Sequence, residues 1–395
     1  MTNKVFIASA ARTAIGSFGG ALSTQAPTSL ATEVSTSAID RAGISAEQIQ
    51  NVVFGHVINT EAKDMYLSRV AAVQAGVPIE APAMNVNRLC GSGAQAIVSG
   101  VQSIALGDVN VALVGGAECM SRGPHSTQTI RQGQKMGNFS FDDMMLGALN
   151  DPFGHGHMGV TAENIAQKHD ISREQQDTFA VQSHQRAAKA IAEGVFKSQI
   201  VPIEIKSRKG SVVFDTDEHV REDASVDGMA TLRTVFKKDG SVTAGNSSGI
   251  NDGAAALVLM SEQAMQDQGV TPLAEIVGYA HAGVEPELMG LGPVPAVQAL
   301  SKRTGIAIGD FELIESNEAF AAQACAVSKL LELDTDRVNP NGGAVGLGHP
   351  VGATGAILAV KTVYELHRTN KDLGLVTMCI GGGQGIALAI RRVSN

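Results

Sequence analysis

The sequence predicts an α/β protein in which one unit of helix and strand occurs twice. Its glycines, 44 in 395 residues, are concentrated at turns between short apolar runs, a pattern typical of buried strands that feed helices. Two continuous apolar runs, residues 109–115 and 375–380, each lead into a glycine cluster. An amphipathic stretch precedes each of them, at residues 91–106 and 352–366. The order of helix, strand and glycine turn is therefore the same in both halves.

The other elements predicted along the chain are strands and one long helix. Residues 1–10 contain a short apolar run that suits a first strand, and strand-like apolar patterns return at 254–260 and 271–277. Between them, residues 173–193 have the pattern of a long amphipathic helix. Ser172, with Gln175 three residues later, is typical of a capping box that opens such a helix, and Gly194 is typical of its end.

These elements divide the chain into two halves and an insertion. We expect an N-terminal half over residues 1–120 that is completed by about 250–271, and a C-terminal half over 272–395. Residues 121–249 are richer in Met, His and charge, which favours an inserted loop domain. The fold class is thus α/β, with a duplicated unit and an insertion, and the reactive segments of both halves meet at the junction.

Composition excludes several classes of protein. With 44% hydrophobic and only 17% charged residues, the chain is not disordered. No 18-residue apolar run is recognised in the sequence, which argues against a membrane span. The N-terminus is a poor signal peptide, and four cysteines without a regular framework suggest free thiols in a reducing compartment. We therefore expect a cytoplasmic protein.

Nucleic acid, metals and bound cofactors are not expected partners. A net charge of −9 makes nucleic acid an improbable ligand. The one close histidine pair, His155 and His157, lacks companions at ligand spacing, so no metal site is predicted. The segment Gly91-Ser-Gly93-Ala-Gln-Ala96 loosely matches a dinucleotide fingerprint, but no acidic residue follows at the end of the next strand.

Cys90 and His349 are the predicted nucleophile and base. Cys90, in Leu-Cys-Gly-Ser-Gly, comes just before the helix predicted at 91–106. Free N–H groups and the helix dipole there are expected to lower the pKa of its thiol. His349, in Gly-Leu-Gly-His-Pro, holds the corresponding position before the helix at 352–366. It is the natural group to accept the thiol's proton.

A second thiol and an amide complete the predicted site. Cys379 follows a buried strand and precedes three glycines, so the N–H of Gly381 is free to bind a substrate oxygen. A second thiol suggests a second proton transfer. Asn317 is expected at a junction of strand and helix, where its amide would hold a water or an oxyanion. Cys119 and Cys325 lie in apolar surroundings and are interpreted as core residues.

Taken together, these segments resemble the thiolases, the acetyl-CoA C-acyltransferases, in order and along the entire chain. Within that family the chain looks most like the bacterial short-chain β-ketothiolases. The segments that carry the resemblance are Asn-Arg-Leu-Cys90-Gly-Ser-Gly, Gly-Gly-Ala-Glu118-Cys-Met-Ser, His157-Met-Gly-Val-Thr-Ala-Glu163-Asn, Gly245-Asn-Ser-Ser248-Gly, Asn317-Glu-Ala-Phe320, Gly-Leu-Gly-His349-Pro and Cys379-Ile-Gly-Gly-Gly.

The resemblance implies a fold and a reaction. The fold would be the five-layered α/β/α/β/α arrangement with a loop domain that covers CoA, in a homotetramer built as a dimer of dimers. The reaction would be the reversible Claisen condensation of acetyl-CoA with a short acyl-CoA to a 3-ketoacyl-CoA, through an acyl group on Cys90. Cys379 would move the second proton, and CoA thioesters would be substrates, with no further cofactor.

The resemblance also implies residues for CoA. Ser248 and His157 would meet the pantetheine, and Arg221 would sit by the adenine. One oxyanion hole would be His349 with a water on Asn317, and the other the N–H groups of Cys90 and Gly381. Further CoA contacts are implied at Leu149, Met158, Ala244, Ala319 and Phe320.

The chain departs from the family pattern near the nucleophile, and two alternatives stay open. Arg88 and the pair Ala94-Gln95 replace commoner residues, and Gly228 stands where a CoA-contacting Ser is often found. One alternative is a decarboxylating condensing enzyme of the ketoacyl synthase type, which typically has His in place of both Cys379 and Asn317. The other is a silent thiolase-like carrier of lipid or CoA.

Overall fold

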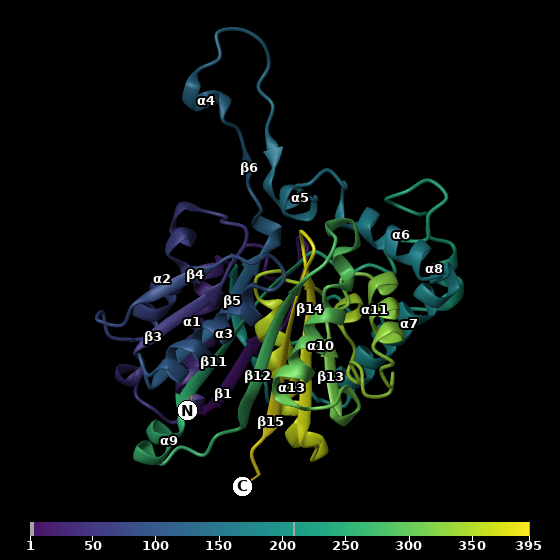
Figure 1. The fold of residues 1–395 in the computed structure, drawn as a ribbon. Coiled ribbons are helices and arrows are strands. Elements are labelled where there is room, and N and C mark those ends of the chain that lie inside the picture. The colour runs from purple at the N-terminus through teal and green to yellow at the C-terminus, as the bar shows by residue number, and fades with distance from the viewer. Residues whose placement is uncertain (1–3, 208–209, 395) are drawn as a thin grey trace.

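The strands of both halves lie in one large mixed sheet in the computed structural model, which describes residues 4–207 and 210–394. Across this sheet the strands are ordered β13 (Leu313–Ser316), β14 (Leu373–Ile380), β15 (Gln384–Arg392), β12 (Ala274–Gly283), β1 (Val5–Thr13), β11 (Asn251–Ser261), β5 (Val111–Cys119), β3 (Asn51–Gly55) and β4 (Ala83–Val86). The antiparallel pair of β1 and β12 joins the two halves (Figure 1).

The two halves repeat one topology. In the N-terminal half, β1 pairs antiparallel with β11, β11 antiparallel with β5, and β5 parallel with β3. In the C-terminal half, β12, β15, β14 and β13 follow in the same order and with the same directions. The duplication that the sequence predicts is therefore confirmed.

Helices form three layers around the two parts of the sheet. The outer helices of the N-terminal half are α1 (Pro27–Ala42) and α2 (Leu67–Gln74), and those of the C-terminal half are α10 (Pro293–Thr304) and α11 (Ala321–Leu330). Between them, α3 (Ser92–Leu106) and α13 (Thr354–Thr369) pack against each other. With the two parts of the sheet, these helices make the predicted five layers.

Strand alternation explains why the layers stack. In β1, Val5 and Ile7 belong to the core around α3 and α13, whereas Phe6 and Ala8 belong to the core under α1. Successive side chains of a strand point to opposite faces, so a fully apolar strand packs helices on both sides. The central helix α13 is buried almost all round, and Lys361 on it pairs with Glu315 at 2.6 Å.

The stretch Leu89–Leu106 is long and apolar enough to pass as a membrane span, contrary to the expectation from the sequence. In the structure this stretch is the nucleophile loop followed by α3, and 56% of it is buried. Helix α3 packs on β3, β5 and α13. The core helix of a protein passes the same test of length and composition, so the finding is weak evidence for a membrane.

The insertion contains a projection and a helical part. Figure 1 shows β6 and α4 on a segment that stands away from the body. The predicted capping box is confirmed, because Ser172 and Gln175 cap each other's backbone at the start of α7. The elements are β6 (His125–Ser126), α4 (Thr129–Gln132), β7 (Asp142–Asp143), α5 (Met144–Leu149), α6 (Met158–Lys168), α7 (Arg173–Ala192), β8 (Ile200–Val201), β9 (Ile203–Ser207), β10 (Gly210–Phe214) and α8 (Val226–Ala230).

Some predicted boundaries are shifted. The strand expected at 109–115 is β5, which runs on to Cys119, and Cys379 lies inside β14 rather than after it. Helix α13 begins at Thr354, so His349 lies in the loop before it. The remaining short elements are β2 (Gly16–Ser17), α9 (Glu262–Gln268), α12 (Ala344–Leu347), η1 (Ala46–Gln48), η2 (Ala62–Tyr66), η3 (Met120–Arg122), η4 (Pro286–Leu291) and η5 (Ile308–Asp310).

Candidate active site

A tight turn presents the thiol of Cys90. Leu89, directly before it, has a φ of 46°, in the left-handed region that side chains rarely adopt. The Ser92 hydroxyl, at the start of α3, donates to the carbonyl of Leu89 at 2.6 Å and accepts from the N–H of Arg88 at 2.8 Å. At Gly91, a Cβ would lie 2.4 Å from the end of the Ile380 side chain, so a larger residue there would have to displace Ile380 of β14. The strained turn is thus held by α3 on one side and the second half on the other.

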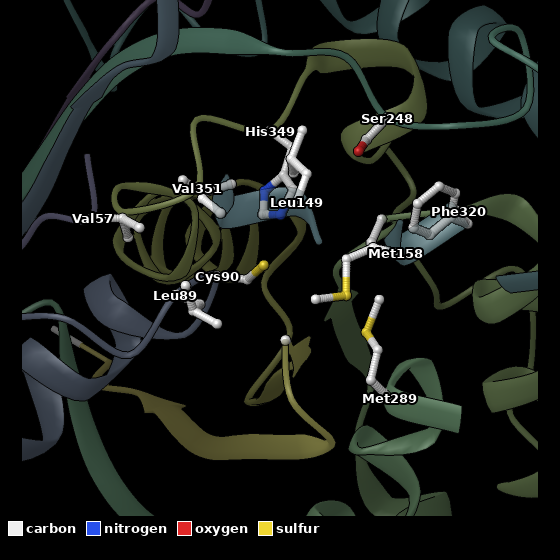
Figure 2. Close-up of a pocket in the computed structure, with 13 residues that line it drawn as sticks. Val57, Leu89, Cys90, Leu149, Met158, Ser248, Met289, Phe320, His349 and Val351 are labelled. Carbon is white, nitrogen blue, oxygen red and sulfur yellow. The ribbon is translucent and has the colours of Figure 1, made fainter. Parts of the chain in front are cut away.

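Cys90, His349 and Gly381 line one apolar cavity. Figure 2 shows the sulfur of Cys90 and the ring of His349 facing the same space, with Met158, Met289 and Phe320 on the other side. The predicted residues Leu149, Ser248 and Ala319 also line this cavity. The sequence analysis missed five more lining residues that come from other elements or from the motif flanks, namely Val57, Leu89, Ala148, Met289 and Val351.

The predicted lowering of the Cys90 pKa is wrong. Burial raises the pKa of the thiol to about 11, and the charge of Glu118 raises it further, whereas the N–H groups of Gly381 and of Cys90 itself lower it. The loss of hydration around the sulfur raises the pKa more than the N-terminus of α3 lowers it. The spacing of residues in the sequence does not reveal this balance. The resting nucleophile is therefore a thiol, and its sulfur already faces the two N–H groups that the resemblance assigned to an oxyanion hole.

His349 is held with one ring nitrogen free. Its backbone N–H donates to Asn251 at 2.9 Å, and its Nδ1 lies 2.7 Å from the Thr354 hydroxyl. That hydroxyl donates its own proton to the carbonyl of Pro350 at 2.9 Å. In the contact with Thr354, Nδ1 must therefore be the donor. Nε2 is then the unprotonated nitrogen, and burial lowers the pKa of His349 to about 4, which keeps the ring neutral. A neutral imidazole with a free Nε2 is the form that a general base requires.

Asn317 and Cys379 lie behind the cavity wall. The Asn317 amide nitrogen is 3.5 Å from His349 Nε2, and its oxygen is buried without a partner among the described residues. Such an oxygen suits the bound water that the resemblance implies. Cys379 is fully buried in β14, packed in the cluster that contains Met158 and Phe320. Burial raises the pKa of Cys379 strongly, so the thiol keeps its proton at rest, and a thiolate at Cys90 would raise this pKa further.

The other two cysteines are not part of this site. Cys119 is fully buried at the end of β5, as predicted for a core residue, and burial raises the pKa of its thiol. Cys325 lies in α11, partly buried, and lines a separate surface groove. Neither thiol lines the cavity of Cys90.

A second cavity is lined by the predicted residues Arg221 and Ala244. It is also lined by His184, His219 and Ser247, and the N–H of Arg221 donates to His184 Nδ1 at 3.2 Å. The neighbouring residues Ser247 and Ser248 line different cavities. The segment 244–248 is therefore a common wall, which a long ligand would cross to occupy both cavities.

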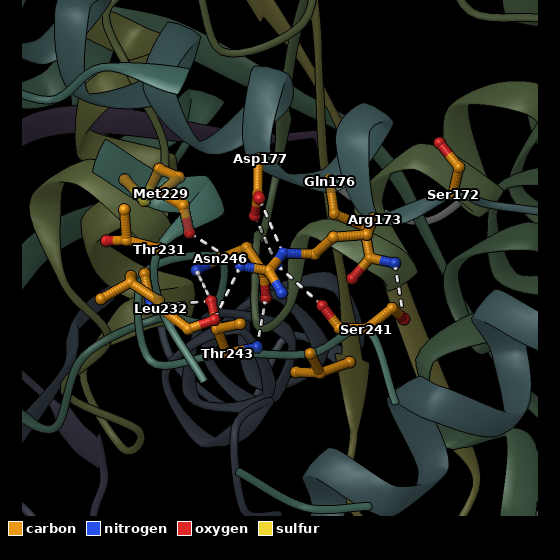
Figure 3. A network of polar contacts seen from close by, with 12 residues as sticks. Ser172, Arg173, Gln176, Asp177, Met229, Thr231, Leu232, Ser241, Thr243 and Asn246 are labelled. Carbon is orange, nitrogen blue, oxygen red and sulfur yellow. Dashed lines mark hydrogen bonds and ion pairs between the residues drawn. The ribbon is translucent and has the colours of Figure 1, made fainter. Parts of the chain in front are cut away.

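Polar contacts fix this wall to α7 (Figure 3). The Asn246 amide donates to Asp177 at 2.9 Å and accepts from the N–H of Thr243 at 2.8 Å. Arg173 binds Asp177 at 2.6 Å and donates to the carbonyl of Met229 at 2.7 Å, which ties α8 to the same network. Because buried hydrogen-bond networks hold one geometry, the wall between the cavities is rigid.

His157 lies outside both cavities in the structure. It caps α6, where its Nδ1 accepts from the N–H of Gly159 at 3.0 Å. Its ring stacks on Phe236 at 4.6 Å, and Phe236 meets Phe320 edge to face at 6.1 Å. His157 therefore supports the aromatic side of the cavity through Phe236, and its predicted contact with pantetheine stays a prediction.

The fold and the site define a two-part α/β enzyme with a cysteine nucleophile, a neutral histidine base and a second thiol. Comparison with known proteins makes the class specific. The thiolase N-terminal domain matches residues 5–263, and the thiolase C-terminal domain matches residues 270–392. The chain therefore belongs to the thiolase family, whose members are acyltransferases.

The relatives cover the chain from end to end. The chain is 57% identical over 394 residues to the beta-ketothiolase BktB of Cupriavidus necator, with 100% of both chains covered. The acetyl-CoA acetyltransferase of Bacillus anthracis has a structure with a TM-score of 0.97 and 45% identity, covering 99% of each chain. Human mitochondrial 3-ketoacyl-CoA thiolase, solved in complex with CoA, has a TM-score of 0.96 and 41% identity, covering 99% of this chain and 98% of that one.

These relatives identify the reaction. The chain is an acyltransferase that carries out the reversible condensation of acyl-CoA thioesters, with thiolysis of a 3-ketoacyl-CoA as the reverse. A ketoacyl-synthase-type enzyme is not favoured, and neither is a silent carrier.

Proposed function

We propose that Cys90 carries the acyl group and that Cys379 moves the proton of the second half-reaction. The observation that supports this most is the placement of Cys90, His349 and the N–H of Gly381 around one apolar cavity. Cys379 lies close enough behind them for the charge of Cys90 to raise its pKa. The nucleophile comes from the N-terminal half and the other three groups from the C-terminal half.

In the first half-reaction, Cys90 gives its proton to Nε2 of His349 and its sulfur attacks the thioester carbon. The oxyanion that forms is stabilised by the N–H groups of Cys90 and Gly381. The bond from carbon to the CoA sulfur then breaks, and the departing CoA thiolate takes the proton of Cys379. The products are an acyl group on Cys90, a protonated His349, a Cys379 thiolate and free CoA thiol.

In the second half-reaction, the Cys379 thiolate removes a proton from the methyl group of acetyl-CoA. The enolate oxygen is stabilised by His349 and by a water on Asn317, because its charge develops next to both groups. The enolate carbon attacks the acyl group, the bond to Cys90 breaks, and His349 returns its proton to the sulfur. The raised pKa of Cys379 suits this role, since the thiol yields its proton only to a thiolate formed beside it.

CoA is proposed to span both cavities. Ser248, Leu149, Met158, Ala319 and Phe320 would surround the pantetheine arm in the cavity of Cys90. Arg221 and Ala244 would lie beside the nucleotide end in the second cavity, where Arg221 brings the positive charge that phosphates need. We propose short acyl groups as substrates, since the apolar side chains of Val57, Leu89 and Val351 line the cavity together with Cys90.

We propose that the protein is a cytoplasmic homotetramer. The projection at residues 121–149 exposes large apolar side chains, including Ile130, Met136, Phe139 and Phe141. Exposed apolar side chains gathered on one segment are typical of an interaction surface. The edge strand β4 also has a free edge in the single chain, with Met84 half-exposed. Two separate surfaces are what a dimer of dimers requires.

Alkylation tests the assignment of the nucleophile. Iodoacetamide should label Cys90 first, because Cys119 and Cys379 are fully buried and Cys90 lines the open cavity. Cys325 should react more slowly, because burial raises the pKa of its thiol to about 12. Acetyl-CoA should protect Cys90, which peptide mapping by mass spectrometry would show together with residual activity. Full loss of activity with the label on Cys119 or Cys325 would contradict the assignment. As a control, Cys90→Ala protein should still bind CoA by calorimetry.

A further inference from the structure

Glu118 is the counterpart of Cys379 in the repeated topology. The parallel pair β3 and β5 ends at Gly55 opposite Gly116, and the parallel pair β13 and β14 ends at Ser316 opposite Thr377. His56 follows β3 as Asn317 follows β13. Counting two residues beyond the last pair gives Glu118 in one half and Cys379 in the other. The N-terminal half thus has a His and Glu pair where the C-terminal half has its catalytic Asn and Cys.

The carboxylate of Glu118 connects three backbone groups from both halves. It is fully buried, and it accepts hydrogen bonds from the N–H groups of Val57 at 3.0 Å, Ile58 at 3.1 Å and Gly352 at 3.0 Å. The His56 ring lies 3.4 Å from the same carboxylate and also contacts the carbonyl of Ala117 at 2.9 Å. Burial raises the pKa of Glu118, whereas His56 and the three N–H groups lower it.

The groups that Glu118 holds are parts of the active-site cavity. Val57 and Val351, the neighbour of Gly352, both line the cavity, and Gly352 belongs to the loop that carries His349. A Cβ on Gly352 would lie 2.4 Å from the Glu118 carboxylate, so the loop approaches as closely as glycine allows. One carboxylate therefore connects the wall formed by the segment after β3 to the histidine loop of the other half.

We propose that Glu118 is a positioning residue of the thiolase reaction, which holds the His349 loop against the Val57 wall so that the base faces Cys90. Removing its hydrogen bonds would free Gly352 and shift His349 relative to the nucleophile, without touching the second cavity. Its negative charge has a separate effect, because it opposes formation of the Cys90 thiolate in the resting site.

Two variants separate the position of the carboxylate from its charge. Glu118→Gln removes the charge and replaces one acceptor oxygen by a donor that faces an N–H group. Glu118→Asp keeps the charge but withdraws the carboxylate by one methylene from Gly352. Asp64→Asn is a matched control, since Asp64 is fully buried and accepts from the N–H groups of Thr60 and Glu61 but has no bond to the histidine loop.

Both Glu118 variants are expected to lower kcat for condensation about tenfold to a hundredfold, with the KM for CoA in thiolysis unchanged. Only Glu118→Gln should alkylate faster at Cys90, several-fold at neutral pH, while Cys119 and Cys325 stay unlabelled. Asp64→Asn should match the parent in both assays.

Two results would overturn the proposal. Full kcat in a folded Glu118→Asp protein would show that the tie to Gly352 does not position the base. A Glu118→Gln protein that loses kcat and labels all four cysteines would show loss of structure instead. If one variant does not fold, the other still decides whether the carboxylate's position is required.

Discussion

At the residue scale, the resting site keeps both of its reacting partners neutral. The Cys90 thiol has its pKa raised to about 11, and His349 has its pKa lowered to about 4, in both cases chiefly by burial. A thiolate and imidazolium pair is thus a minor species in the free enzyme. The proton moves when a thioester carbonyl reaches the N–H groups of Cys90 and Gly381 and accepts the developing charge.

The pH dependence of alkylation follows from the raised pKa of the Cys90 thiol. Only the thiolate reacts with iodoacetamide, so below the raised pKa of Cys90 the labelling rate of the free enzyme should rise about tenfold per pH unit. We expect this rise to continue from pH 7 to pH 9 without levelling, measured as pseudo-first-order inactivation with the label mapped to Cys90. A plateau near pH 7 would mean that the thiol is already ionised and that its pKa is lowered, as the position before α3 had suggested.

The sequence-based prediction brought Cys90, His349 and Gly381 together at one site but failed for their electrostatics. Cys90, His349 and Gly381 are recognisable because glycines flank them, and the structure places all three around one cavity. The predicted direction of the shift in the Cys90 pKa was wrong, because the desolvation of the thiol depends on residues far away in the chain. Thr354 determines which ring nitrogen of His349 is unprotonated. This role could be assigned only from the contacts of its hydroxyl with His349 Nδ1 at 2.7 Å and with the carbonyl of Pro350 at 2.9 Å.

At the scale of elements, the site is built from ends and loops that a rigid frame holds in place. Helices α3 and α13 pack side by side in the central layer, and the loops before them carry Cys90 and His349. Apolar periodicity predicted both helices to within three residues at each end. It could not predict Val57 or Met289 in the cavity. Val57 follows β3 and Met289 lies in η4, and the apolar pattern distinguished neither of these elements.

The projection at residues 121–149 is predicted to form the contact that joins two dimers into the tetramer. Replacing residues 127–141 by a short glycine and serine linker removes its exposed apolar side chains and leaves the β6 and β7 pair to close the loop. Light scattering should then report a dimer in place of a tetramer. Condensation should persist, because the cavity residues from this region, Ala148 and Leu149, lie in the part that remains. An unchanged molar mass would assign the tetramer contact to another surface.

At the scale of the whole molecule, duplication explains why residues so distant in sequence share one site. The two halves repeat a topology in which a reactive residue precedes the central helix, so the central layer brings both loops together. The copies then diverged at equivalent positions. One half has Asn317, whose amide lies 3.5 Å from His349, and the buried thiol of Cys379. The other half has His56 and Glu118, whose carboxylate accepts from the N–H groups of Val57 and Gly352.

The most direct test of the division of labour is the intact mass of Cys379→Ser protein after mixing with acetyl-CoA. The account predicts a gain of one acetyl group, mapped to Cys90, because His349 activates the nucleophile and, without the Cys379 thiol, the departing CoA thiolate takes its proton from His349 or from solvent. Condensation should fall about 10²-fold to 10⁴-fold, the usual contribution of a general base, and Cys90→Ala protein should gain no acetyl group. A Cys379→Ser protein that forms no acyl-enzyme, or one that condenses at the parent rate, would contradict the account.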